Sequence, residues 1–567
     1  MALGLREEGA DTDSDSGSGS DSDSEGAPLE LTPAELMRAI LLAPVDLLWN
    51  GGIGTYVKAR GESNGDVGDR ANDAIRVNGA DLRVKVVGEG GNLGATQLGR
   101  IEAALAGVQI NTDAIDNSAG VDTSDHEVNL KILLTEQTRA GNLTLKQRNT
   151  LLASMTDEIG AMVLRDNYEQ NVLLGNARAQ ELTMAPVHQR LMHRLEERGE
   201  LSRELEFLPS DADLQARAAD GKGLTSPEFA VLVAYAKLAI KADLTESDLV
   251  EQPFFEKVLR HYFPQAIQDR FDDEIGEHPL RTAIIVNAIA NSMVNRGGIS
   301  FAFRTSEESG ATTAQIARAY VIAREIFDQA AFVDQVEALD NIVATGVQTQ
   351  MYLEFRRLMD RATRWFLQSR PLHSDIESEV ERFTEAVRRF TSVVPDLLGG
   401  AEQTRLEGEV ERLKDEGVPL DLARRVASLL DCFSLLDIVE IAHATGRDVD
   451  LVAATYFLLS ERFEVDALLT RVSRLPREDR WDALARGSLR DDLYTLLASL
   501  TTAVLEASPE ATDATEGVDA WASANADGLG RARTALKDID AVEGAGIAPL
   551  SVALRTLRGV IRSGSAH

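Results

Sequence analysis

Short apolar runs, each closed by a cluster of Gly, Asn, Asp or Ser, characterise residues 45–120. Three such runs occupy residues 45–49, 82–87 and 108–110, and a stretch with helical spacing lies at 98–105. Brief runs bounded by turn residues are typical of buried strands. The pattern therefore predicts a parallel sheet whose polar loops follow the carboxyl ends of its strands.

The loops after these strands are rich in glycine and in amide side chains. Asn50 and Gly51 follow the first strand, Gly90 and Asn92 follow the second, and Asn117 lies beyond the third. Glycine permits turns that need a positive φ, which would explain any one of these loops. Amide side chains, however, donate and accept hydrogen bonds at once. Three convergent loops of this kind predict a ligand site at the edge of the sheet.

Beyond residue 144 the apolar positions follow a helical period. Helix starts with capping-box character are present at Thr32 and Thr144, and a further helix opens at Thr225. The most apolar stretch, residues 229–240, is interrupted by Lys237 and is too short to cross a bilayer, so it predicts a buried helix and no membrane segment. We interpret these apolar stripes as core-packing faces rather than cofactor contacts.

These patterns predict an α/β fold, with a partial Rossmann-like parallel sheet, followed by a large all-α C-terminal region. Residues 1–30 form an acidic Asp/Ser leader with too few apolar residues to fold. An α/β domain then covers 31–140, a helical domain 141–400 and a C-terminal helical region 401–567. Within the last region, residues 507–531 are predicted to be a loose linker before a final helix.

Composition narrows the class of protein further. The formal net charge of −34 argues against nucleic-acid binding, which depends on Lys and Arg neutralising phosphates. A single cysteine, Cys432, excludes an internal disulfide and a cysteine-based zinc spacing, so no metal site is expected. The N-terminus lacks the basic and apolar regions of a signal peptide, and we expect a cytoplasmic protein.

Two polar strings invite interpretation. Residues 69–73 are charge-dense and precede the second strand, so they are expected either to contact a partner or cofactor or to form a local salt-bridge network. Residues 124–127 contain Ser, Asp and His, but neighbours in sequence point in different directions, and a hydrolase triad is built from separate segments. A hydrolase is therefore not expected.

The run from residue 43 to 134 carries long motifs: APVDLLWNGGIGTYVKA, VGDRANDAIRV, VVGEGGNLGATQLGRIE and NTDAIDNSAGVDTSDHEVNLKILL. Together they resemble the large bacterial NAD-specific glutamate dehydrogenases. GEGGN is also similar to the EGAN segment of ordinary glutamate dehydrogenases, and DNSAGVDTS to their ANAGGVxxS segment. Residues 144–369 resemble the helical region that follows the dehydrogenase part of the large enzymes.

This resemblance implies that residues 31–140 form a partial dinucleotide-binding domain with NAD as cofactor and glutamate and 2-oxoglutarate as substrates. By position, Asn92 would lie near the nicotinamide ribose and Asn117 near the carboxamide, while Ser124 would face the side-chain carboxylate of glutamate. Asn50 would help to orient the nicotinamide. Gly51 and Gly90 complete the implied cofactor-binding set, and a homo-oligomer is expected.

The sequence departs from the family pattern in two small ways. Gly91 stands where Ala is usual, and Ser118-Ala119 where Ala-Gly is usual. All of these residues are small, so the backbone is still expected to approach the cofactor closely.

The resemblance also shows what is missing. In the family, the catalytic lysine and acid precede the cofactor domain, and no segment here resembles the glycine-flanked lysine motif. A GxGxxG fingerprint is absent, because the glycines at 51–54 have the wrong spacing. We therefore assign no catalytic residue, and expect a C-terminal portion of the enzyme that starts within the cofactor domain and is inactive alone. The alternatives are a non-catalytic regulatory or oligomerisation protein with a decayed half-site, and another amino-acid dehydrogenase.

Overall fold

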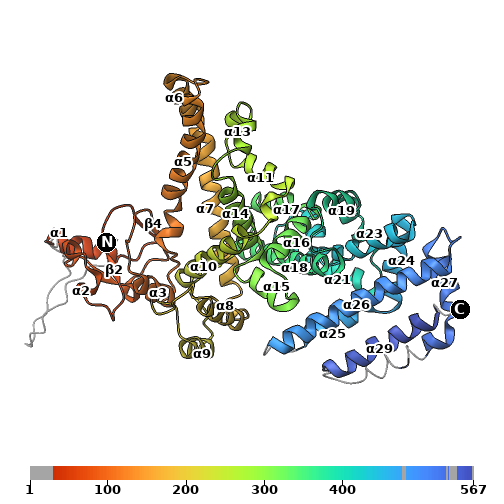
Figure 1. The fold of residues 1–567 in the computed structure, drawn as a ribbon. Coiled ribbons are helices and arrows are strands. Elements are labelled where there is room, and N and C mark those ends of the chain that lie inside the picture. Colours follow the sequence, from red (N-terminus) through yellow and green to blue (C-terminus); the bar gives the residue numbers. More distant parts are fainter. Residues whose placement is uncertain (1–29, 476–479, 531–533, 535–545, 565–567) are drawn as a thin grey trace, which may run out of the picture. The chain divides into compact units, whose positions relative to one another are not determined.

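The computed structural model describes residues 30–475, 480–530, 534 and 546–564 (Figure 1). The predicted leader lies outside the described residues, except for residue 30. The chain forms two compact units, one of residues 1–245 and 256–295 and the other of residues 246–255 and 296–567. The boundaries of these units differ from those of the segments 31–140, 141–400 and 401–567 that the sequence predicted. The predicted division into domains stays a prediction.

The sheet of the first unit is parallel but small. Strand β1 (Leu47–Asn50) pairs in parallel with β4 (Val86–Glu89), so that Asn50 lies opposite Glu89. The predicted third strand contributes a single parallel bridge, from Gln109 to Val86. A second pair, β2 (Val57–Lys58) and β3 (Val77–Asn78), is also parallel. Strands are thus present at both places, but β1 covers only 47–49 of the predicted 45–49 and β4 only 86–87 of the predicted 82–87, and a complete Rossmann-like sheet is not confirmed.

Helix α3 (Gln97–Leu105) covers the core of this α/β part, which consists of small and β-branched residues. Its close approach to residues 79–81 requires glycine, since a Cβ atom on Gly79 would lie 2.2 Å from the carbonyl oxygen of Gly99. Helix α1 (Pro33–Leu41) begins with the predicted capping box at Thr32 and buries none of its residues. The short helix α2 (Asn64–Val67) follows β2.

The rest of the first unit is helical, and this helical region begins at Asp113, earlier in the chain than the predicted residue 144. Residues 116–120 are not a loop, because α5 starts at Ser118 with Asn117 as its N-cap residue. The helix that starts after Thr144 is interrupted at Met155, since α6 ends before that residue and α7 starts at Thr156. The helices are α4 (Asp113–Asp116), α5 (Ser118–Arg139), α6 (Leu145–Ser154), α7 (Thr156–Arg178), α8 (Ala185–Glu197), α9 (Asp211–Ala219), α10 (Ser226–Thr245), α11 (Glu256–His261), α12 (Gln265–Gln268), α13 (Asp272–Gly276) and α14 (Arg281–Ser292).

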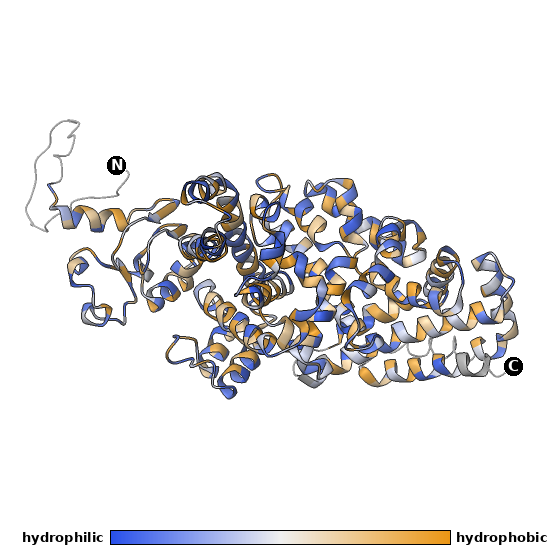
Figure 2. Ribbon diagram, turned by 45° about the horizontal axis from the view of Figure 1, so that its top comes forward, coloured by the Kyte–Doolittle hydropathy of each residue, from blue (hydrophilic) through white to orange (hydrophobic). Residues whose placement is uncertain are grey.

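Helix after helix forms the second unit, as the apolar periodicity predicted, and Figure 2 shows apolar and polar residues alternating around them. The predicted linker at 507–531 is wrong, because α27 lies within it and buries Val518 and Trp521. The helices are α15 (Phe301–Ser309), α16 (Thr313–Ile326), α17 (Gln329–Glu337), α18 (Thr345–Ser369), α19 (Ile376–Thr391), α20 (Val394–Leu397), α21 (Gly400–Asp415), α22 (Leu420–Ala427), α23 (Leu435–Thr445), α24 (Val449–Arg462), α25 (Val465–Arg474), α26 (Arg480–Ala507), α27 (Ala514–Ala524) and α29 (Ile547–Gly564).

Among the described residues, no helix is both long and apolar enough to cross a membrane. The apolar stretch at 229–240 instead forms the middle of α10, where Phe229, Leu232 and Val233 are buried. This confirms the predicted buried helix.

Candidate functional site

Two of the predicted site residues meet directly. The side-chain amide Nδ2 of Asn117 donates a hydrogen bond to Oδ1 of Asn92 at 2.8 Å. Asn92 is exposed in the loop after β4, and Asn117 caps the N-terminus of α5. The bond uses one donor and one acceptor, so the Nδ2 of Asn92 and the Oδ1 of Asn117 are left without a hydrogen bond to any described side chain.

Asn50 lies beside the same loop. Its carbonyl oxygen accepts a hydrogen bond from the Gly91 amide at 3.1 Å. The loops after β1 and β4 touch through their backbones, since a Cβ atom on Gly91 would lie 2.5 Å from the Gly52 carbonyl oxygen. A Cβ atom on Gly94 would lie 1.9 Å from Nδ2 of Asn50. These glycines therefore let the Asn50 side chain and the Asn92 loop occupy one edge of the sheet.

The indole of Trp49 lies next to both Gly51 and Gly90. The indole of Trp49 lies over β4 and the residue that follows it, because Cβ atoms on Gly88 and Gly90 would be 2.8 and 2.5 Å from its ring. A Cβ atom on Gly51 would lie 3.4 Å from the indole nitrogen. Despite these contacts, Trp49 is 63% exposed. Both glycines stand at the predicted edge of the sheet, where Gly90 makes room for the indole and Gly51 lies at ordinary van der Waals distance from it.

A buried ion-pair cluster that the sequence analysis missed holds this edge together. Arg100 donates two hydrogen bonds to Glu89, of 2.6 and 2.8 Å, and its guanidinium also lies 3.1 Å from Asp113. Asp113 in turn accepts a hydrogen bond from the Leu93 amide, and Asp116 accepts one from the Glu89 amide. Burial raises the pKa of Glu89, and the hydrogen bond and charge of Arg100 oppose that rise.

This cluster positions the residue that precedes Leu93, which is Asn92. The signal in the sequence was an arginine on the otherwise apolar face of the 98–105 stretch. A buried arginine requires a carboxylate partner, and the acid that closes the preceding strand supplies it.

Ser124 does not contact the amide pair. It lies in α5, where its Oγ donates to the Val121 carbonyl oxygen at 2.6 Å. An α-helix turns by about 100° per residue, so one face of α5 carries Asn117, Val121, Ser124 and Val128. Along the helix axis, Ser124 lies about 10 Å from Asn117. Val121 and Val128 are 67% and 52% exposed. The structure therefore places both predicted polar residues on one open face of α5.

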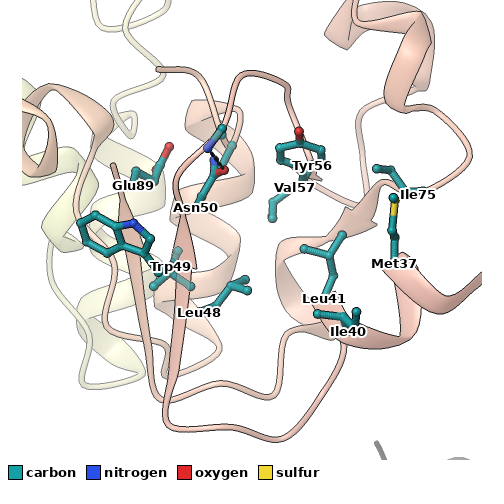
Figure 3. A pocket seen from close by; sticks show the side chains of 14 residues that line it. Met37, Ile40, Leu41, Leu48, Trp49, Asn50, Tyr56, Val57, Ile75 and Glu89 are labelled. Atoms are coloured by element: carbon teal, nitrogen blue, oxygen red, sulfur yellow. Dashed lines mark hydrogen bonds between the residues drawn. The ribbon is translucent and has the colours of Figure 1, made fainter. Parts of the chain in front are cut away.

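Beside this edge, a pocket of about 280 Å³ separates α1 from β1. Figure 3 shows Ile40 and Leu41 of α1 facing Leu48 of β1 across it. Asn50 and Glu89 contribute to its wall. The pocket is thus largely apolar, with polar groups where the strands end.

The charge-dense string at 69–73 forms a local network. Asp69 accepts hydrogen bonds from the Thr55 amide and from Asn72, at 2.8 and 2.6 Å. Asp73 pairs with Arg76 at 2.5 Å, and Arg76 also donates to the Thr55 carbonyl oxygen. Of the two interpretations of this string, the local salt-bridge network therefore describes these residues.

Comparison with protein families shows which family this chain belongs to. Residues 24–177 match the model for the catalytic domain of bacterial NAD-glutamate dehydrogenase, and residues 221–559 match the model for the glutamate dehydrogenase C-terminal region. The chain belongs to the bacterial NAD-specific glutamate dehydrogenase family. The resemblance drawn from the sequence motifs is confirmed, and all six predicted site residues lie within the catalytic-domain match.

Curated relatives in this glutamate dehydrogenase family agree. The NAD-specific glutamate dehydrogenase of Mycobacterium tuberculosis is 44% identical over 540 residues, and that of Pseudomonas aeruginosa 42% over 533 residues. The Halomonas elongata enzyme is 41% identical over 536 residues. These matches cover 94 to 95% of the chain but 33% of each relative. The chain therefore spans about a third of the length of the relatives it matches.

Lys237 has a lowered pKa, as the catalytic lysine of a glutamate dehydrogenase would, but it does not lie on the side of α5 that carries Ser124. Burial lowers the pKa of Lys237 to about 8, although Asp166 and Glu169 of α7 oppose the change. Asp122 of α5, which lies close to Asp166, is on the opposite face of α5 from Ser124. We therefore do not assign Lys237 as the lysine that acts on glutamate.

Proposed function

We propose that this chain supplies the nicotinamide side of the active site in an NAD-dependent glutamate dehydrogenase. The reaction is the oxidative deamination of L-glutamate to 2-oxoglutarate and ammonium, in which the hydride leaves the α-carbon of glutamate. NAD, when bound, accepts this hydride. The amide pair of Asn92 and Asn117 carries the proposal, because it presents a donor and an acceptor side by side at the end of a parallel strand.

The residues of this edge fit the cofactor. The carbonyl and amino group of a carboxamide are complementary to the acceptor on Asn117 and the donor on Asn92. A glycine-built loop, in which Cβ atoms on Gly91 and Gly94 would clash, lets the backbone come close to a bound nucleotide. Asn50 lies against that loop and orients the nicotinamide.

Ser124 is proposed to bind the side-chain carboxylate of glutamate. Its hydroxyl donates to the Val121 carbonyl in this structure, and it turns toward the substrate when a carboxylate is offered. Because Ser124 and Asn117 share the open face of α5, substrate and nicotinamide would lie along the same helix. The exposed Val121 between them would contact the aliphatic part of glutamate.

The catalytic lysine and acid are proposed to come from polypeptide outside this chain. Support comes from the surface around β1, where Leu47, Trp49 and Ile53 are 55%, 63% and 94% exposed. Among the described strands, β1 pairs with β4 alone, so one edge of β1 is unpaired. An apolar strand edge of this kind suits the addition of further α/β structure.

The test is glutamate-dependent reduction of NAD, measured for this chain alone and for a chain extended by the upstream part of a relative. The proposal expects activity in the extended chain, with loss of NAD binding when Asn117 is replaced by alanine. Asn142→Ala, in the turn after α5, is the matched control. Activity of this chain alone would contradict the proposal that the catalytic lysine lies outside it. If neither chain binds NAD, the regulatory protein is favoured instead.

A further inference from the structure

A second group of polar residues lies on the other face of α5, where it packs against α7 (Figure 1). Asp122 and His126 are four residues apart in α5, so they share one face of the helix. Asp166 of α7 joins them. One oxygen from each carboxylate and one nitrogen of the imidazole all lie within 4.8 Å of one another.

The imidazole in this group is buried and has no hydrogen-bond partner. His126 is 3% exposed, and its Nε2 lies 3.9 Å from Oδ1 of Asp122, which is too far for a hydrogen bond. No other described residue forms a hydrogen bond with the ring. The carboxyl groups of Asp122 and Asp166 are hydrogen-bonded to each other, and no described N–H or hydroxyl group donates to the buried Oδ2 of Asp122. Buried polar atoms normally have partners, since leaving one unsatisfied costs about 1–3 kcal/mol.

The ring is nevertheless held in a fixed orientation. It stacks on Tyr262, the residue after α11, with the ring centroids 4.5 Å apart and the planes 17° from parallel. The Tyr262 hydroxyl accepts a hydrogen bond of 2.7 Å from Asn129, one turn further along α5. The stack holds the ring in place while its nitrogens form no hydrogen bond with a described residue, and a neutral imidazole nitrogen is the commonest metal ligand in proteins.

The surrounding charge favours a cation. Asp125 and Glu169 add their fields to those of the two carboxylates. The positive charge facing this group from α10 is Lys237, which acts on Asp166 and Glu169 but forms no ion pair within 4.0 Å of a described carboxylate. Arg165 pairs with Glu169 at 3.0 Å, so three aspartates, Asp122, Asp125 and Asp166, face one ammonium group and a histidine.

We propose that Asp122, His126 and Asp166 form a binding site for one divalent transition-metal ion, best suited to Zn²⁺. An imidazole nitrogen with two carboxylate oxygens is a ligand set that Zn²⁺ accepts, and three protein ligands leave an open position for water. Metal–ligand bonds of about 2.0–2.2 Å require the three ligand atoms to move closer together. Rotation of the two aspartate side chains is enough for that movement. No spacing of cysteines marks such a site in the sequence, because its ligands come from two helices.

The ion would clamp α5 to α7 close to the candidate active site. Asn167, next to Asp166, already donates hydrogen bonds to Ser118 Oγ and to the Ile115 carbonyl oxygen, at 2.9 and 2.8 Å. These contacts lie one turn before Asp122. A metal at this point would extend the same junction and secure the end of the helix that carries Asn117. The site itself does not depend on the proposed dehydrogenase function.

Isothermal titration of the chelator-treated chain with ZnCl₂ near neutral pH tests the proposal. We expect one Zn²⁺ per chain, and affinity reduced at least about tenfold in Asp166→Asn and in His126→Gln. Glu127→Gln is the matched control, because Glu127 is exposed on the same helix and paired with Lys131 instead. Lys237→Met should strengthen binding, since it removes the opposing charge.

Circular dichroism of each variant separates loss of the site from loss of the fold, and Asp166→Asn preserves the side-chain shape. Absence of Zn²⁺ binding by the folded wild-type chain would overturn the proposal. Equal affinity in the wild type and both ligand variants would overturn it as well. Competition by excess Mg²⁺ as effective as Zn²⁺ itself would show an oxygen-only site and exclude His126 as a ligand.

Discussion

The side chain of Asn117 donates a 2.8 Å hydrogen bond to that of Asn92, which joins the N-terminus of α5 to the loop after β4. Twenty-five positions separate the two residues. The bond fixes both amides at one end of the parallel sheet, and one polar atom on each amide is left without a hydrogen bond to a described side chain. Under the proposed function, this bond would couple cofactor binding to the packing of α5.

We predict that this coupling appears in a double-mutant cycle. Asn92→Ala and Asn117→Ala should each weaken NAD binding about tenfold in the extended chain, because each removes a ligand contact and disorders its neighbour. The double variant should lose less than the sum, with an interaction energy of about 0.5–1.5 kcal/mol. Fluorescence titration of NAD measures all three. Strict additivity would show that the amides act independently.

The loop contact between Gly91 and Gly52 gives a second prediction. Gly91→Ala should weaken NAD binding and lower the free energy of unfolding by about 1–3 kcal/mol, because the new Cβ atom meets the Gly52 carbonyl oxygen at 2.5 Å. Gly52→Ala is the control, since a Cβ atom there meets nothing within 4 Å. Urea denaturation of both variants checks the difference, and equal stability would contradict it.

Removal of Arg100 should be far more costly than removal of an exposed cation. Arg100→Met leaves Glu89 buried without its partner, and we expect a loss of about 3–5 kcal/mol in the free energy of unfolding. Lys85→Met breaks the equally short pair with Asp46, but both of those side chains are exposed and stability should change little. Denaturant unfolding compares the two variants. Similar losses would mean that the buried cluster contributes no more than a surface pair.

The second unit should lose stability as pH rises toward neutrality. Burial raises the pKa of Asp437 to about 7, although Trp365 donates a 2.7 Å hydrogen bond to its carboxyl group. The folded state therefore holds a proton that the unfolded chain releases near pH 4. The stabilising contribution is complete below about pH 4 and is lost as pH rises through 7.

Thermal unfolding between pH 4 and 8 measures this dependence. Asp437→Asn should reduce it and should raise stability above pH 7, because the amide keeps the hydrogen bond from Trp365 without carrying a charge. Part of the slope should remain, since burial also raises the pKa of Glu402 to about 7. An unchanged slope in Asp437→Asn would show that this carboxyl group is charged in the folded state throughout the range.

The sequence by itself determined the local elements of this protein and the family to which it belongs. Capping residues and apolar periodicity located α1, α6 and α10, and short apolar runs located β1 and part of β4. These features depend on backbone sterics and on burial of one face, which neighbouring residues specify. The motifs around Asn92 and Asn117 likewise placed the candidate site at the strand ends.

Only the tertiary structure decided which distant groups meet. The start of α5 at Ser118, the Glu89–Arg100–Asp113 cluster and the approach of Asp166 to His126 all depend on how separate segments pack. A polar residue carries no local signal of its partner, because its charge is satisfied by whatever side chain the fold brings near. Pairing of buried polar groups is therefore a property of the packed core, whereas helix and strand positions are properties of the chain.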